Sequence, residues 1–254
     1  MDSTVVGLLT FLAIFAGGMI GLQMYRLLPD QHLLPETRDI VRLAIGMISV
    51  LASLVLGLLT ASAKSTFDST DQKMRSYAAD IILIDAELRE YGPATDPIRK
   101  MLLDYTDRAV RTTWPDTATE QQPLEDKNAG MLLDRMALAI LLLTPANENQ
   151  RWLREQALNL AEQMIHTRWA MLVSQEGSIS PVLLVIMVVW ITVIFGSFGL
   201  NAPRNATVVA AFLVCSMSIG TSIFLILEMD TPLSGVIMIS GAPMKHALAH
   251  LQEL

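Results

Sequence analysis

Four long stretches of this 254-residue chain contain no Asp, Glu, Lys, Arg or His, and they constrain its fold more than any other feature. A helix needs about 20 predominantly apolar residues to cross the hydrocarbon layer of a membrane. The four runs extend over residues 5–24, 43–63, 181–200 and 206–227. We therefore predict an integral membrane protein with four transmembrane helices in two hairpins.

Residues between the second and third runs have a different character, with frequent charges and apolar residues at helical spacing. The chain is 52% hydrophobic and only 17% charged, so most of its apolar excess lies in the four runs. We predict an all-α protein with an inserted helical soluble domain. The expected domains are transmembrane hairpin 1 at residues 1–63, the soluble domain at 64–180, transmembrane hairpin 2 at 181–228, and a C-terminal tail with a short helix at 229–254.

The first part of the predicted soluble domain carries a heptad stripe that continues from the second span. We expect one unbroken helix from Leu43 to Tyr91, stopped by Gly92-Pro93, so that an event at the domain shifts the membrane helices directly. Packing inside the domain and self-association are both open interpretations of the stripe. Its residues are Phe67, Met74, Ile81 and Leu88, with Tyr77, Ile84 and Tyr91 between them.

Three further helices complete the predicted domain. Asp96-Pro97 supplies a cap and a first-turn proline for the first of them. A loop from Trp114 to Asp126 precedes a helix to about Leu143, and a last helix covers residues 147–173. The apolar face of the first helix comprises Ile98, Met101, Leu102, Tyr105 and Ala109.

Several function classes find no support in the sequence. The net charge is −7 and no basic face is apparent, which argues against a nucleic-acid partner. The usual catalytic and phosphate-binding motifs are missing, so we expect neither an enzyme nor a cofactor. His246 and His250 are one helical turn apart without a third ligand nearby, and we expect no metal site.

Small and hydroxyl-bearing residues recur every four positions along the second span. Close helix packing explains such a pattern, and so does the lining of a pore formed by several copies of this helix. For the similar series Ala13, Gly17 and Gly21 in the first span we favour helix packing. The pore-lining candidates are Ile45, Ser49, Ser53, Leu56 and Thr60.

Charged residues where the second and fourth spans end are the pore-mouth candidates: Lys64, Glu228 and Asp230. For the two carboxylates, helix termination in water competes with a charged vestibule as the interpretation. The distribution of Lys and Arg around the spans nearly balances and does not decide the orientation. An even number of spans places both termini and the domain on one side.

Three stretches of the chain together resemble the bestrophin-like membrane proteins of bacteria and plants. Members of that family usually have an acidic residue before Trp-Pro and an Arg-Pro-Phe in the later motif, whereas this chain has Thr113 and Thr231-Pro232-Leu233. The stretches are Gly57-Leu-Leu-Thr-Ala-Ser-Ala-Lys64, Asp104-Tyr-Thr-Asp-Arg-Ala-Val-Arg-Thr-Thr-Trp114-Pro115, and Glu228-Met-Asp-Thr-Pro-Leu-Ser-Gly235 followed by Val-Ile-Met-Ile-Ser240.

The resemblance implies kinship with bestrophins, which are pentameric anion channels with a pore lined by the second span and a helical cytosolic domain. It therefore implies a homo-oligomer, with a pentamer expected, that conducts small anions such as chloride. It also implies a location in the bacterial inner membrane, with the domain and both termini cytoplasmic. The alternative from a different class is a non-conducting membrane scaffold or sensor whose helical domain binds a partner.

Overall fold

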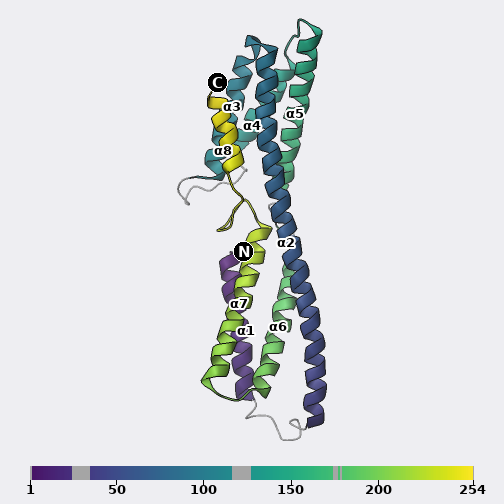
Figure 1. Ribbon diagram of the computed structural model, residues 1–254, viewed down its shortest axis with the longest axis vertical. Coiled ribbons are helices and arrows are strands. Elements are labelled where there is room, and N and C mark those ends of the chain that lie inside the picture. The colour runs from purple at the N-terminus through teal and green to yellow at the C-terminus, as the bar shows by residue number, and fades with distance from the viewer. Residues whose placement is uncertain (1, 25–34, 116–126, 174–176, 178, 254) are drawn as a thin grey trace. The chain divides into compact units, whose positions relative to one another are not determined.

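The computed structural model describes residues 2–24, 35–115, 127–173, 177 and 179–253 (Figure 1). Regular structure within these ranges is helical, with no strand, as predicted. The chain divides into two compact units, which we describe separately. The first comprises Met1–Thr66 and Ser178–Asp230, and the second comprises Phe67–Gly177 and Thr231–Leu254. The link between the first two apolar runs falls at 25–34, and the predicted loop to Asp126 falls at 116–126, both outside the described residues.

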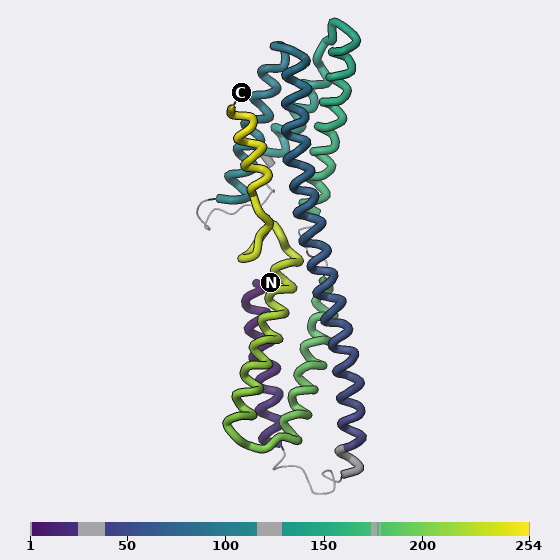
Figure 2. The backbone as a smooth tube through the Cα atoms, viewed as in Figure 1, coloured from purple at the N-terminus to yellow at the C-terminus, as the bar shows by residue number. Residues whose placement is uncertain are grey.

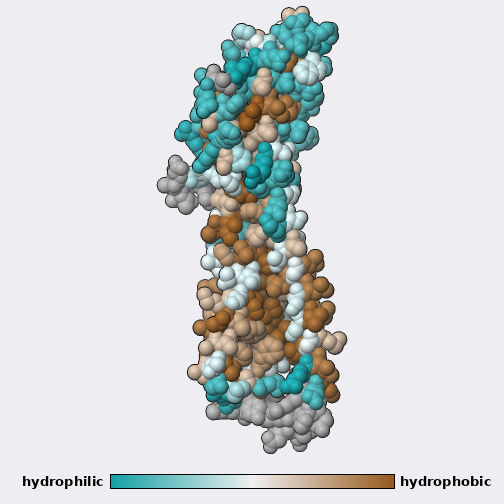
Figure 3. Space-filling view, viewed as in Figure 1, coloured by the Kyte–Doolittle hydropathy of each residue, from teal (hydrophilic) through white to brown (hydrophobic). Residues whose placement is uncertain are grey.

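The first unit contains four helices that are long and apolar enough to cross a membrane. They are α1 (Ser3–Met24), the first part of α2 (Pro35–Tyr91), α6 (Pro181–Asn201) and α7 (Ala206–Asp230). The surface of this unit is largely hydrophobic, whereas that of the second unit is largely hydrophilic (Figure 3). An apolar surface of this extent is stable only against lipid or other apolar surfaces.

Helix α1 packs closely against α6 and α7 because glycines leave room for the neighbouring backbone. A Cβ atom at Gly21 would lie 2.0 Å from the carbonyl oxygen of Gly196 in α6, and one at Gly7 would lie 3.1 Å from that of Gly220 in α7. Gly17 faces Thr192 in the same way. The small residues of the first span therefore serve helix packing, as predicted.

Helix α2 is the least covered of the four membrane helices. Only 17% of its apolar window is buried, against 39% for α1. Ala52, Leu59 and Ala63 are its buried membrane residues. Gly46 and Gly57, by contrast, have no neighbour within 4 Å of where a Cβ would stand. One side of α2 thus packs on its own chain, while the adjoining side is open.

The second unit is built from the remainder of α2, η2 (Pro93–Thr95), α3 (Asp96–Thr113), α4 (Lys127–Leu141), α5 (Glu148–Val173) and α8 (Ala242–Gln252) (Figure 2). The heptad stripe of α2 lies in the core of this unit and supports packing within the domain. Phe67 is partly buried, and the other six positions are at most 5% exposed: Met74, Tyr77, Ile81, Ile84, Leu88 and Tyr91.

Helix α2 is continuous from Pro35 to Tyr91, which confirms the predicted unbroken helix. Gly92 follows with φ of 119°, a backbone conformation that favours glycine. The prediction that Asp96 caps α3 was wrong, because the helix begins at Asp96 itself and Thr95 occupies the cap position. The Thr95 hydroxyl instead lies within donating distance of two carbonyl oxygens, that of Leu88 at 2.5 Å and that of Gly92 at 2.8 Å, and so closes the turn.

A polar cluster is enclosed within the core of the second unit. The hydroxyls of Tyr77 and Tyr105 are hydrogen-bonded to each other, and Arg168 is only 5% exposed. Burial raises the pKa of both phenols, with the nearby Arg168 charge opposing the shift. Both tyrosines therefore stay neutral, and the cluster acts as a fixed polar element of the core.

Candidate functional site

The open side of α2 carries a stripe of small and polar residues, which we call the α2 stripe. Its members are separated by three or four positions, as one face of a helix requires. Ser53, Gly57, Thr60 and Lys64 are exposed, and Ser49 is half-buried. The stripe consists of Gly46, Ser49, Ser53, Gly57, Thr60 and Lys64.

The hydroxyl groups of the α2 stripe are satisfied within their own helix. Ser49 donates to the carbonyl oxygen of Ile45, Ser53 to that of Ser49, and Thr60 to that of Leu56, each at 2.8 Å. These bonds leave the hydroxyl oxygens as acceptors on the open side. Turning one hydroxyl toward an anion exchanges a hydrogen bond with a net value of about 0.5–1.5 kcal/mol, so each can become a donor at small cost.

The five residues singled out as pore-lining candidates fall on two adjoining sides of α2. Ser49, Ser53 and Thr60 belong to the α2 stripe. Ile45 and Leu56 are partly buried and pack against the apolar cluster of the membrane helices in the same chain. A single chain therefore partly covers the two bulky candidates and Ser49, and leaves Ser53 and Thr60 uncovered.

The charged candidates at the span ends differ in burial. Lys64 is exposed, whereas Glu228 is 3% and Asp230 is 4% exposed. Asp230 Oδ2 accepts a hydrogen bond from the backbone N–H of Ile179, 3.1 Å away. Asp230 therefore ties the end of α7 to the residues before α6. The interpretation that the two carboxylates end α7 in open water was therefore wrong, because both are buried. Their burial also disfavours contact of either carboxylate with an ion path.

Two sequence motifs that carried the family resemblance meet in the second unit. The indole Nε1 of Trp114 donates to the carbonyl oxygen of Ile239 at 3.1 Å. The backbone N–H of Ile239 in turn donates to the carbonyl oxygen of Pro232 at 3.0 Å. The backbone of Gly241 lies close to the indole, since a Cβ atom at this position would be 2.7 Å from the ring. Sequence reasoning treated the motifs separately, because no local pattern indicates a contact between residues 125 positions apart.

The part of the chain that the structure describes contains no group of three His, Cys, Asp or Glu side chains placed to hold a metal ion. His246 is exposed and His250 is half-exposed on α8. The distinctive features of the chain are therefore its long apolar helices, the open α2 stripe and the motif contact around Trp114.

These features define an all-helical integral membrane protein, and comparison with known proteins identifies its family. The model of the Bestrophin-like domain matches residues 12–244, and the chain belongs to this family. A search of curated proteins found no match.

Solved structures share the fold at low sequence identity. A crystal structure of a bacterial Bestrophin homolog from Klebsiella pneumoniae, solved by Zn-SAD phasing, has 11% identity and a TM-score of 0.67, with 97% of each chain covered. A single-site variant of that homolog has 12% identity and a TM-score of 0.68, again with 97% of each chain covered. A crystal structure described only as that of a membrane protein has 11% identity, the same coverage and a TM-score of 0.69. The likeness therefore extends over nearly the whole chain.

Proposed function

We propose that the chain forms a homo-oligomeric channel for small anions such as chloride, in which copies of the α2 stripe line the pore. The observation that carries this proposal is the exposure of the stripe in a single chain. The exposed Ser53, Gly57, Thr60 and Lys64 offer lipid tails little apolar surface, and the charge of Lys64 favours water. Assembly around an axis gives them an aqueous path.

Charge on the stripe supports anions as the permeant ions. The apolar run of α2 contains no carboxylate, and Lys64 follows it directly. Rings of basic side chains at a pore mouth favour anions. We therefore assign Ser53 and Thr60 to the lining and Lys64 to one mouth, with Ser49 at the edge of the lining and Ile45 and Leu56 flanking it. Glu228 and Asp230 border that mouth as structural supports.

For the assembly we propose a pentamer in the bacterial inner membrane, with both termini and the helical domain on the cytoplasmic side. Membership of the bestrophin-like family supports this arrangement, as does the fold shared with a bacterial Bestrophin homolog. The division at about residues 63, 180 and 228 into two hairpins, a domain and a tail remains our proposed organisation of the full chain.

Chloride flux from liposomes containing the purified protein tests the proposal. We expect Thr60→Val and Ser53→Ala to lower flux several-fold, because each removes a group that can donate to an anion. Thr221→Val and Ser222→Ala are matched controls, since those hydroxyls are exposed on α7 and make the same bonds four residues back, at 2.9 Å. Flux through the controls should equal that of the unmodified protein.

Two results would contradict the channel. A purified oligomer that passes neither chloride nor cations at any voltage would favour the non-conducting scaffold or sensor. A ring whose axis is not lined by Ser53 and Thr60, seen by electron microscopy, would remove the α2 stripe from the path even if flux were present.

A further inference from the structure

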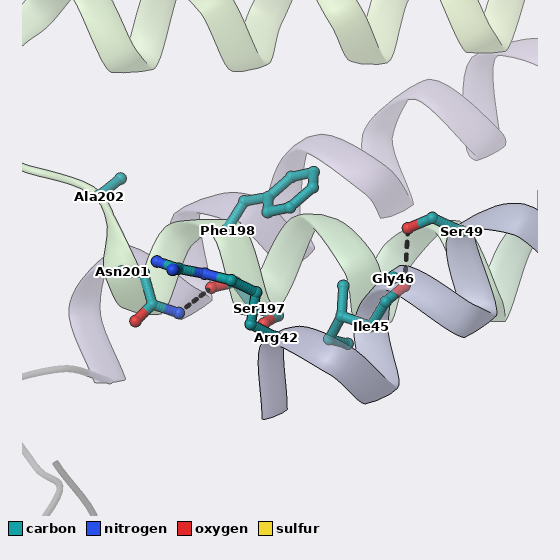
Figure 4. Close-up of a pocket in the computed structure, with 8 residues that line it drawn as sticks. All are labelled: Arg42, Ile45, Gly46, Ser49, Ser197, Phe198, Asn201 and Ala202. Atoms are coloured by element: carbon teal, nitrogen blue, oxygen red, sulfur yellow. Dashed lines mark hydrogen bonds between the residues drawn. The ribbon is translucent and has the colours of Figure 1, made fainter. Parts of the chain in front are cut away.

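A pocket of about 440 Å³ lies between α2 and α6 in the first unit, at the end where α2 enters and α6 leaves the apolar region (Figure 4). Arg42 directly precedes the uncharged run of α2, and Asn201 directly follows that of α6. The pocket is therefore at the depth of the lipid headgroups. Its lining consists of Arg42, Ile45, Gly46, Ser49, Ser197, Phe198, Asn201 and Ala202. Gly46 and Ser49, the first members of the α2 stripe, border this pocket, so the proposed pore lining begins at Ser53.

The polar half of this pocket suits a phosphate group. Arg42 extends toward Asn201 and Ser197 (Figure 4). Among the residues that the structure describes, no carboxylate lines the pocket or pairs with Arg42. The Asn201 amide donates one hydrogen to the carbonyl oxygen of Ser197 at 3.0 Å and keeps its second N–H. A guanidinium with an amide beside it offers the forked donors that phosphate oxygens accept.

The apolar half of the pocket distinguishes a lipid from a free anion. Phe198 is 51% exposed, and Ile45 forms part of the facing wall. A volume of 440 Å³ equals that of about fifteen water molecules in the liquid. A small inorganic anion would leave most of this space to water against apolar side chains. A headgroup with its glycerol and first methylenes would fill both halves.

We propose that this pocket binds the phosphate-bearing headgroup of an anionic glycerophospholipid, with Arg42 contacting the phosphate and Phe198 the glycerol and first acyl methylenes. A guanidinium held between two membrane helices is suited to such a headgroup, because its forked donors match phosphate oxygens. The proposal does not depend on conduction, since lipid binding at this pocket is measured without an ion gradient.

Native mass spectrometry of the delipidated full chain, titrated with lipid, tests the proposal. We expect dioleoyl phosphatidylglycerol to bind at least tenfold more tightly than dioleoyl phosphatidylcholine, because the pocket presents the positive charge of Arg42 and its described lining contains no carboxylate. Arg42→Gln should weaken phosphatidylglycerol binding about tenfold or more, through loss of a charged hydrogen bond. The phosphatidylglycerol affinity of Arg42→Lys should lie between those of Arg42→Gln and the unmodified protein, since lysine keeps the charge but lacks the forked donors of arginine.

Arg204→Gln is the matched control for net charge. Arg204 lies near the same end of the membrane helices but donates from Nε to the carbonyl oxygen of Leu22, 2.9 Å away, and does not line the pocket. Its phosphatidylglycerol affinity should stay within twofold of the unmodified protein. If Arg42→Gln fails to fold, Asn201→Ala provides a second pocket variant and should weaken phosphatidylglycerol binding severalfold.

Three results would overturn the proposal. Equal affinity for the two lipids would remove the preference for an anionic headgroup. Unchanged binding in a folded Arg42→Gln variant would place the lipid elsewhere. Displacement of phosphatidylglycerol by millimolar inorganic phosphate would identify the pocket as a site for free anions.

Discussion

The indole N–H of Trp114, at the end of α3, donates a hydrogen bond to the backbone carbonyl of Ile239, in the segment that follows α7. The contact joins the Trp-Pro motif to the motif that begins at Glu228. Gly241 completes it, because its lack of a side chain lets the indole lie against the backbone. Two of the three stretches by which the chain resembles its family thus meet in one structural joint in the second unit.

Removing this joint should lower the stability of the second unit. Trp114→Phe deletes the donor and leaves the Ile239 carbonyl without its partner, at a cost of about 1–3 kcal/mol. Gly241→Ala should cost a similar amount, since the added Cβ would come within 2.7 Å of the indole ring. Thermal unfolding in detergent measures both effects. Unchanged unfolding temperatures for both variants would contradict the structural role of the contact.

Two glycine substitutions test whether Gly21 packs against another helix of the same chain while Gly57 lies on the open side of α2. Gly21→Ala should destabilise the membrane helices by about 1–3 kcal/mol or more, because its Cβ would overlap the Gly196 carbonyl and push α1 away from α6. Gly57→Ala should leave unfolding unchanged or slightly improved, since nothing lies within 4 Å. Equal losses in the two variants would show that the Gly57 face is covered in the folded protein.

The course of α2 was predictable because its determinants are local. No proline interrupts the chain between Pro35 and Pro93, and the heptad stripe continues past the membrane run. The glycine packing of α1 was predictable for the same reason. Which sides of α2 are covered could not be predicted, because Ile45, Leu56 and the exposed Leu58 are equally apolar in sequence. Only the placement of the other membrane helices decides which of them is covered.

The burial of Asp230 was also beyond sequence reasoning. A carboxylate beside a turn is usually in water. Its partner here is a backbone N–H 51 positions away, and nothing in the sequence marks that amide as a donor without a helical acceptor. The Trp114 contact was missed for the same physical reason, since its acceptor is a main-chain carbonyl of the kind that every residue has.

The tie between Asp230 and Ile179 gives a prediction of its own. Asp230→Ala should destabilise the protein by about 1–3 kcal/mol, because the part-buried N–H of Ile179 loses its acceptor. Asp230→Asn keeps a carbonyl oxygen at the same place and should cost less. Unfolding temperatures of the two variants in one detergent provide the comparison. An Asn variant as unstable as the Ala variant would show that the charge, rather than the acceptor, matters.

Two buried aspartates of α2 in the second unit should respond to mutation in opposite directions. Asp85 is 1% exposed and accepts hydrogen bonds from Arg89 at 2.6 Å and Arg99 at 2.8 Å. Asp80 is 7% exposed, and within the described residues its Oδ2 has no partner. Asp85→Asn should lower the unfolding temperature through loss of charged hydrogen bonds, whereas Asp80→Asn should raise it near neutral pH.

The effect at Asp80 should depend on pH. Burial raises the pKa of its carboxyl above the usual 3.8, so the folded protein favours the protonated form. The destabilisation by the charged form is absent below the ordinary pKa and grows as pH rises toward the folded-state value. Asp80→Asn should therefore stabilise the protein most at about pH 7 and hardly at all at about pH 3, below the ordinary pKa of Asp. Unfolding temperatures of both proteins across this range measure the difference, and a constant offset at all pH values would assign the effect to packing instead of charge.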